Sequence, residues 1–119
     1  MDRMVLVVED NATLRSGLVA LLRMSDFGAS GAASVAEATA YLDAAPQVPT
    51  HVFLDLNLPD GPGTAVLRAV RGRSMPVRVA LMTGASDSGL IEQAQALGVD
   101  AVFIKPPDWD ELLDWVAKA

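Results

Sequence analysis

The feature that most constrains the fold of this chain is a repeated alternation between two kinds of apolar pattern. Short unbroken apolar runs, such as "MVLVV" and "HVFLD", alternate with stretches in which apolar residues recur every three or four positions. The first pattern is typical of strands buried on both faces, and the second is typical of amphipathic helices. Five strands alternating with five helices predict an α/β domain, with a parallel sheet covered by helices on both faces.

Gly, Pro, Asn and Asp residues between these patterns give approximate bounds for the strands and helices. We expect strands at Met4–Val8, within Phe27–Ala33, and at His51–Asp55, Val77–Thr83 and Asp100–Ile104. We expect helices from Asn11 through the leucines at 14, 18, 21 and 22, from Ser34 to Ala44, and over 63–72, 88–98 and 108–118. Asn11, Ser34 and Asp108 are the expected N-caps, and Gly72 and Gly98 are expected to end their helices. At 119 residues the chain is long enough for a single core, and no internal linker appears, so residues 1–119 are expected to form one domain.

Composition narrows the classes of function. Half of the 119 residues (51%) are apolar and 20% are charged, as in globular proteins. The chain has no cysteine, which excludes disulfides and thiolate sites. It has no apolar run long enough to cross a bilayer and no secretory leader pattern, so we expect a cytoplasmic protein. A net charge of −6 disfavours direct binding to nucleic acid or to anionic membranes.

Polar residues follow the expected strands at the points where the strands end. Ligands of such sheets gather beyond the carboxyl ends of the strands. Those ends carry Glu9 and Asp10, Asp55, Thr83 and Lys105. Three carboxylates that lie close together repel one another unless a cation joins them, and oxygen ligands without His or Cys suit Mg²⁺. The sequence therefore predicts a magnesium site at this edge.

The remaining groups at this edge suit chemistry on a phosphoryl group. Asp55 can act as a carboxylate nucleophile toward phosphorus. Lys105 can neutralise a phosphoryl oxygen, and the Thr83 hydroxyl can donate to the same group. Each residue alone has an ordinary explanation: a solvated strand cap, a surface lysine or a turn-forming threonine. Their arrival together at neighbouring strand ends favours a functional site.

The blocks "VLVVEDN", "VFLDLNLPDGPG", "LMTGAS" and "VFIKPP" resemble the signature blocks of response-regulator receiver domains. These domains are the phosphoacceptor modules of two-component signalling. The resemblance covers nearly the whole chain. It implies a flavodoxin-like (βα)₅ fold, a doubly wound parallel five-stranded sheet with strand order 2-1-3-4-5.

The resemblance also implies a role for each site residue. Asp55 would be the phosphoacceptor, Thr83 the switch hydroxyl and Lys105 the phosphate-binding lysine. Mg²⁺ would be held by Glu9, Asp10, Asp55 and the backbone carbonyl of Asn57, with Asp10 the more direct ligand of the acidic pair. Pro106 corresponds to a family proline that often follows a cis peptide bond.

The implied activity is that of a switch, not of an enzyme acting on free substrates. A histidine kinase or histidine phosphotransfer protein would donate the phosphoryl group, and the first helix, with Arg15, Ser16 and Val19, would be the docking side. The phosphorylated domain would then bind an output protein or domain, and a homodimer through the fourth helix, fifth strand and fifth helix is possible in this family. Ala85 offers no group to orient water, which predicts slow to moderate self-dephosphorylation.

One position departs from the family pattern. The family commonly has Tyr or Phe three residues before the lysine, and the ring turns inward on activation. Here that position is Val102, and Phe103 lies one residue later, which predicts that its ring is on the opposite face of the strand. Pro107, a second proline, is expected to stiffen the start of the last helix.

The last helix contains both tryptophans of the chain. Its periodicity predicts that Trp109, Leu112, Leu113 and Val116 share the face that packs on the sheet. Trp115 lies roughly 110° from the centre of that face by the same periodicity. Two interpretations of Trp115 remain open: a half-buried side chain against the first or fourth helix, or a contact with a partner.

Three other functions compete with a phosphorylated receiver. A haloacid-dehalogenase-like phosphatase also uses a strand-end Asp with Mg²⁺, but it usually needs a second Asp at the position of Asn57. A flavin-binding module would need a polar phosphate loop after the first strand, where this chain has Glu9 and Asp10. A receiver-like scaffold that is never phosphorylated remains open because of Val102.

Overall fold

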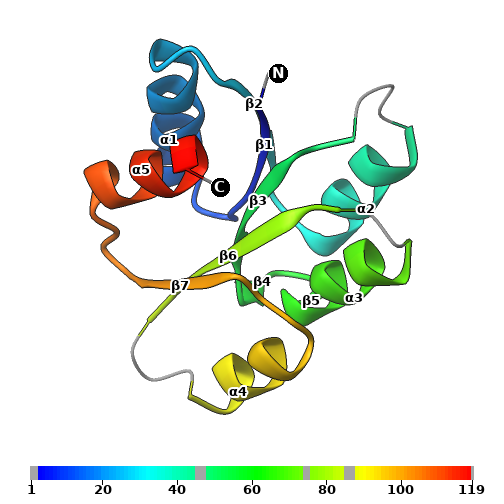
Figure 1. The fold of residues 1–119 in the computed structure, drawn as a ribbon. Helices are drawn as coiled ribbons and strands as arrows, with labels where there is room; N and C mark the ends of the chain where they lie inside the picture. Colours follow the sequence, from blue (N-terminus) through cyan, green and yellow to red (C-terminus); the bar gives the residue numbers. More distant parts are fainter. Residues whose placement is uncertain (1–2, 45–47, 74–75, 85–87, 119) are drawn as a thin grey trace.

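The computed structural model describes residues 3–44, 48–73, 76–84 and 88–118. Its centre is a parallel sheet of five strands, in the order β2-β1-β3-β6-β7 (Figure 1). The strands are β1 (Met4–Val8), β2 (Gly28–Ala32), β3 (His51–Asp55), β6 (Arg78–Thr83) and β7 (Ala101–Ile104). Counted among the five sheet strands alone, this order is 2-1-3-4-5. The predicted flavodoxin-like fold is therefore confirmed. The bounds of β1 and β3 match the prediction, β2 lies within its predicted range, and β6 and β7 each begin one residue later than predicted.

The helices form two layers, one on each face of the sheet (Figure 1). They are α1 (Ala12–Met24), α2 (Val35–Ala44), α3 (Thr64–Gly72), α4 (Ser88–Ala96) and α5 (Trp109–Lys118). α1 and α5 cover one face, and α2, α3 and α4 cover the other. Ala85 lies outside the described residues.

Alternation along the strands divides the core between these two layers. In β3, Val52 and Leu54 belong to the cluster under α2, α3 and α4, whereas Phe53 belongs to the cluster under α1 and α5. All three side chains are fully buried. A strand with both faces buried explains why its sequence is a continuous apolar run.

The predicted N-caps are confirmed. The Asn11 side chain accepts a hydrogen bond from the amide of Leu14 at 2.9 Å. Ser34 Oγ accepts from Glu37 N at 3.1 Å, and Asp108 Oδ1 accepts from Glu111 N at 3.2 Å. Each bond satisfies an amide that the first turn of a helix leaves without a partner.

A short antiparallel hairpin after β3 was not predicted. It consists of β4 (Asn57–Leu58) and β5 (Gly61–Pro62). At its turn, the two carboxylate oxygens of Asp60 accept from the amides of Val35 and Ala36 at 2.8 and 2.9 Å. These bonds lower the pKa of Asp60. The hairpin that follows the β3 carboxylate is thereby joined to the beginning of α2.

The prediction for α5 needs one correction. Leu112 and Val116 are buried as expected, but Trp109 is 40% exposed and lies beside Gly17 of α1. The helical period fixes which residues share a face, but it does not fix how that face is aimed at the sheet. The exposed fraction of Trp109 shows that the true centre of the face lies nearer Leu112 and Val116.

Trp115 is half-buried, and rings from the sheet are its neighbours. Its ring centroid lies 5.1 Å from that of His51, 5.7 Å from Phe53 and 6.4 Å from Phe103. The expected half-burial is correct, but these ring contacts are with strands β3 and β7, not with α1 or α4. Trp115 covers the beginning of β3.

None of the helices in the described ranges combines the length and apolar content that crossing a bilayer requires.

Candidate functional site

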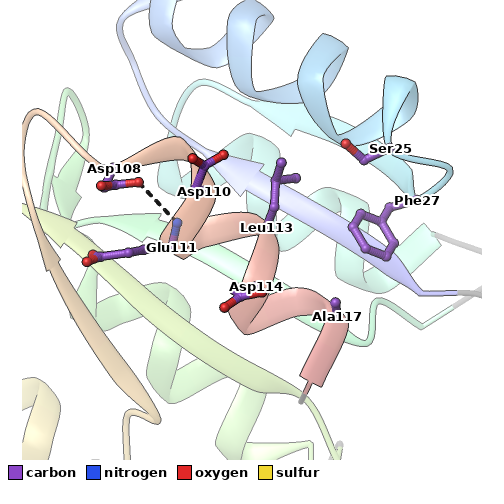
Figure 2. Close-up of a pocket in the computed structure, with 8 residues that line it drawn as sticks. All are labelled: Ser25, Phe27, Asp108, Asp110, Glu111, Leu113, Asp114 and Ala117. Atoms are coloured by element: carbon purple, nitrogen blue, oxygen red, sulfur yellow. Dashed lines mark hydrogen bonds between the residues drawn. The ribbon is translucent and has the colours of Figure 1, made fainter.

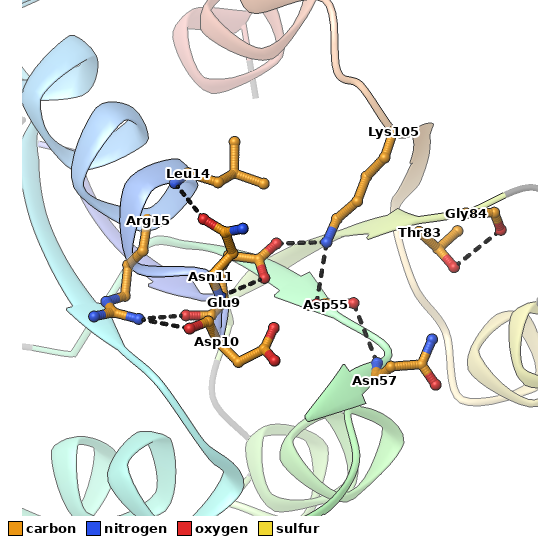
Figure 3. A network of polar contacts seen from close by, with 10 residues as sticks. All are labelled: Glu9, Asp10, Asn11, Leu14, Arg15, Asp55, Asn57, Thr83, Gly84 and Lys105. Carbon is orange, nitrogen blue, oxygen red and sulfur yellow. Dashed lines mark hydrogen bonds and ion pairs between the residues drawn. The ribbon is translucent and has the colours of Figure 1, made fainter. Parts of the chain in front are cut away.

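The register of the sheet brings the predicted polar residues to one edge. Val8 of β1 pairs with Leu54 of β3, so the residues that follow, Glu9 and Asp55, lie side by side. Thr83 ends β6, and Lys105 follows β7 directly, with its amide bonded to the Thr83 carbonyl at 2.9 Å. Figure 3 shows Glu9, Asp55 and Lys105 converging at the carboxyl end of the sheet, with Thr83 to one side beside Gly84.

Lys105 joins two of the three acids. Its Nζ lies 2.5 Å from Glu9 Oε1 and 3.1 Å from Asp55 Oδ2. Glu9 is fully buried and Asp55 is 5% exposed, whereas the lysine side chain is 28% exposed. The ammonium therefore contacts the buried carboxylates on one side and is open to solvent on the other. An incoming anion can approach it from the solvent side.

For both Glu9 and Lys105, burial and the bonds of the ion pair shift the pKa in opposite directions. Burial raises the pKa of Glu9 to about 7, and the hydrogen bonds from Lys105 and from the Asn11 amide oppose this only in part. Burial lowers the pKa of Lys105, but its bonds to Glu9 and Asp55 outweigh that effect, and the net pKa is raised. The lysine is therefore a permanent positive charge at neutral pH.

The Asp55 carboxylate is held from two sides. Oδ2 accepts a hydrogen bond from Lys105, and Oδ1 accepts one from the main-chain N–H of Asn57 at 3.1 Å. The main chain around it is also closely enclosed, because a Cβ on Gly63 would lie 2.1 Å from the Asp55 carbonyl oxygen. Sequence reasoning did not single out Gly63. The signal was present, since a glycine ending "DGPG" marks a turn or a close backbone approach.

The three acids form a group suited to a cation. One carboxylate oxygen each from Glu9, Asp10 and Asp55 lies within 4.8 Å of the other two. Asp10 is exposed, so the group opens to solvent. Three converging carboxylates with a single lysine beside them carry excess negative charge, and the donor set is entirely oxygen. These residues fit a hard divalent ion such as Mg²⁺.

Thr83 and Val102 lie apart from this group. Thr83 is buried, and its hydroxyl donates to the Gly84 carbonyl at 3.3 Å. Val102 packs in the cluster under α2, α3 and α4, and Phe103 packs in the cluster under α1 and α5. The predicted placement of these two side chains on opposite faces is confirmed. The peptide bond between Lys105 and Pro106 is cis, as in the family pattern.

A separate hollow of about 530 Å³ lies between α5 and the segment that joins α1 to β2 (Figure 2). Its lining includes four carboxylates, those of Asp108, Asp110, Glu111 and Asp114. It contains none of the residues of the acidic group at the strand ends. The acids in the first turn of α5 are stabilised there by the helix dipole, and their charge disfavours a phosphorylated ligand.

Comparison with known proteins agrees with this geometry. The family model described as the response regulator receiver domain matches residues 5–117. The chain belongs to the response regulator receiver family, whose members function as phosphoacceptor modules in two-component signalling.

Among curated relatives, the chain is 33% identical over 112 residues to the acid tolerance regulatory protein ActR of Rhizobium meliloti (strain 1021), covering 94% of this chain and 57% of that protein. It is 27% identical over 118 residues to the sporulation initiation phosphotransferase F of Bacillus subtilis (strain 168), covering 99% and 94%. A response regulator receiver protein from Pseudomonas putida superposes with a TM-score of 0.90 at 29% identity, covering 100% and 98%. The chain thus spans little more than half of the length of the first of these relatives.

Proposed function

We propose that Asp55 accepts a phosphoryl group from a histidine kinase or a histidine phosphotransfer protein, in a reaction that depends on Mg²⁺. The observation that carries the proposal is the position of its carboxylate. This carboxylate is buried, yet it contacts the partly exposed Lys105 and belongs to an acidic group that opens to solvent. In the transfer, an Asp55 oxygen forms a bond to phosphorus while the bond from phosphorus to the donor nitrogen breaks, and an acyl phosphate results.

The neighbouring residues are suited to assist this transfer. When bound, Mg²⁺ supplies positive charge that compensates the phosphoryl oxygens. Glu9, Asp10, Asp55 and the backbone carbonyl of Asn57 would hold it. Lys105, already 3.1 Å from Asp55, would donate to a phosphoryl oxygen, and its charge would stabilise the product.

The consequence of phosphorylation would be a change in partner binding. The added charge would draw the Thr83 hydroxyl away from the Gly84 carbonyl and toward the phosphoryl group. With Val102 at the usual aromatic position, the readout would rely on Thr83 and α4, or on another surface. Phosphoryl uptake and its slow loss would be the only reactions that the chain itself promotes.

The proposal extends to domain organisation and partners. Residues 1–119 would form a single receiver domain, consistent with the similar length of the Bacillus subtilis relative. The outer side of α1, with Arg15, Ser16 and Val19, would receive the phosphodonor. An output protein or domain, and possible self-association through α4, β7 and α5, would follow phosphorylation. A net charge of −6 supports a role without direct nucleic-acid or membrane contact, and a cytoplasmic location remains a prediction from composition.

Intact-mass measurement tests the proposal directly. Incubation with acetyl phosphate and Mg²⁺ is expected to add one phosphoryl group, about 80 Da, to the wild-type protein and none to Asp55→Asn. Asp60→Asn is the matched control, because it removes a carboxylate five residues away that lies outside the acidic group.

Absence of the mass gain with acetyl phosphate and with histidine-kinase donors would leave the unphosphorylated scaffold as the better interpretation. Hydrolysis of free phosphate esters would instead favour the phosphatase. The amide at Asn57 and the family match argue against that alternative. The family match and the two acids after the first strand, Glu9 and Asp10, argue against a flavin-binding module.

A further inference from the structure

A charged side chain of α1 holds the main chain of the acidic pair. Arg15 Nη1 donates to the carbonyl oxygen of Glu9 at 2.8 Å and, more weakly, to that of Asp10 at 3.4 Å (Figure 3). The guanidinium contacts main-chain oxygens here, not carboxylates. Arg15 therefore acts on the segment that carries two of the three acids, without using the oxygen atoms that a cation would need.

The path of this side chain depends on the neighbouring edge strand. A Cβ on Gly31 of β2 would lie 3.0 Å from both Cγ and Cδ of Arg15. That separation is tighter than side chains normally adopt. The glycine thus leaves the space along which the aliphatic part of Arg15 runs, and the half-buried stem is fixed between α1 and β2.

The two acids respond differently to their main chain. Glu9 is fully buried, and its carboxylate is held by Lys105 and by the Asn11 amide. Asp10 is exposed, so the direction in which its carboxylate leaves the strand depends chiefly on its own backbone. A donor that fixes the carbonyls of residues 9 and 10 fixes the orientation of both peptide planes around the exposed acid.

We infer that Arg15 is a positioning residue for the Mg²⁺ ligands, orienting Asp10 relative to Glu9 and Asp55 through the carbonyls of residues 9 and 10. The inference rests on the proposed function. Outer partners of metal ligands change metal affinity by roughly 10- to 100-fold when removed. The expected effect is thus on the affinity for Mg²⁺ in the unphosphorylated protein, before any phosphoryl transfer.

The test compares two arginines of the same helix. Arg23 also donates to a main-chain carbonyl, that of Ala29, at 2.8 and 3.2 Å, but far along α1 from the acidic pair. Calorimetric titration with MgCl₂ is expected to give a dissociation constant raised about tenfold or more for Arg15→Met. Arg23→Met is expected to match the wild type. Urea unfolding of both variants measures how much general stability each has lost.

A second variant keeps the charge and moves the stem. Gly31→Ala places a methyl group against the Arg15 stem, which must shift by a few tenths of an ångström. The variant is expected to weaken Mg²⁺ binding by a smaller factor than Arg15→Met. This variant also carries the test if Arg15→Met does not fold.

The outcomes separate this inference from the proposed function. If the wild-type protein binds no Mg²⁺, both fail. If it binds Mg²⁺ and is phosphorylated at Asp55, but Arg15→Met and Gly31→Ala bind Mg²⁺ within twofold of it, only the role of Arg15 is overturned. Equal weakening by Arg23→Met would show that α1 acts through general stability, and it would also overturn that role.

Discussion

Strand β3 begins and ends on an ionisable side chain, His51 and Asp55, and the two side chains have opposite surroundings. His51 is 2% exposed and Asp55 is 5% exposed, and the alternation of the strand puts both on the α1–α5 face. At the Asp55 end the neighbours are a lysine and two acids. At the His51 end the imidazole lies against the ring of Trp115. Burial alone therefore does not make a group reactive, because the neighbouring side chains determine whether the buried group is charged.

The His51 end keeps its group neutral. Nδ1 lies 2.8 Å from Thr50 Oγ1, whereas Nε2 has no hydrogen-bond partner in the described part of the chain. Burial lowers the pKa of His51 to about 4, and the nearby charges of Arg3 and Arg78 contribute in the same direction. Asp100 opposes them weakly. An imidazole under Trp115 thus remains uncharged through the physiological range.

The largest effect is expected from removing the cation at the Asp55 end. Lys105→Met leaves two buried carboxylates without their shared partner and should lower the free energy of unfolding by about 3 kcal/mol at pH 8. The loss should be smaller at pH 5, where Glu9 takes up a proton, and Mg²⁺ should restore part of it. Urea denaturation followed by circular dichroism measures all three.

The other lysine of the chain provides the control. Lys118 pairs with Asp114 at 3.0 Å, with both side chains mostly exposed. Lys118→Met should change the unfolding free energy by less than about 0.5 kcal/mol. A comparable loss in the two variants would show that Lys105 contributes only surface charge, and the contrast between the ends of β3 would disappear.

The next effect concerns the His51 end and has a definite sign. The folded-state pKa of about 4 lies below the ordinary value of 6.5, so the unfolded chain binds the proton more tightly. Stability from the neutral imidazole is complete above pH 6.5 and is lost as the pH falls toward 4. Relative to His51→Leu, the wild type should lose up to about 3 kcal/mol between pH 7.5 and pH 4.

Urea titrations of both proteins at each pH, without metal, give this difference. Glu9 has a raised pKa and contributes in the opposite direction, but it is present in both proteins and cancels. His51 is the single histidine of the chain. A pH dependence that is the same in the two proteins would mean that folding does not lower the pKa of His51.

The smallest effect tests what keeps His51 neutral. Trp115→Leu removes the ring that stands edge-on to the imidazole at 5.1 Å, and it should raise the pKa of His51 toward 6.5 by roughly one unit. The proton resonances of the lone histidine give this pKa by NMR titration. Trp109→Leu is the matched control, and an equal shift there would show that the ring contact is irrelevant.

The sequence predicted the features that depend on local pattern. Buried strands and helix caps are periodic or short-range, so the alternation and the caps at Asn11, Ser34 and Asp108 were predicted correctly. The order of the strands was implied by the resemblance to receiver domains, and it was also correct. Strand ends on a parallel sheet must meet at one edge, which is why Glu9, Asp55 and Lys105 could be expected together. The functional roles assigned to all of the site residues, Asp55 and Lys105 included, stay predictions.

Features that depend on contacts between distant segments were missed. Asp60 reaches the amides of Val35 and Ala36 across 24 or more residues, and no local pattern encodes that bond. The same holds for the path of Arg15 over Gly31. The helical period of α5 grouped Trp109 with Leu112 correctly by angle, but the tilt of a helix on a sheet is set by tertiary packing, so the exposure of Trp109 was wrong.

The contact between Trp115 and His51 gives the protein an optical signal of its own. A protonated imidazole quenches indole fluorescence more strongly than a neutral one, so the emission of Trp115 will report the charge on its neighbour. Trp109, more exposed and on the opposite end of α5, will emit at longer wavelength and serve as an internal reference. The packing of α5 on the sheet can thus be followed by tryptophan fluorescence in the unlabelled wild-type protein.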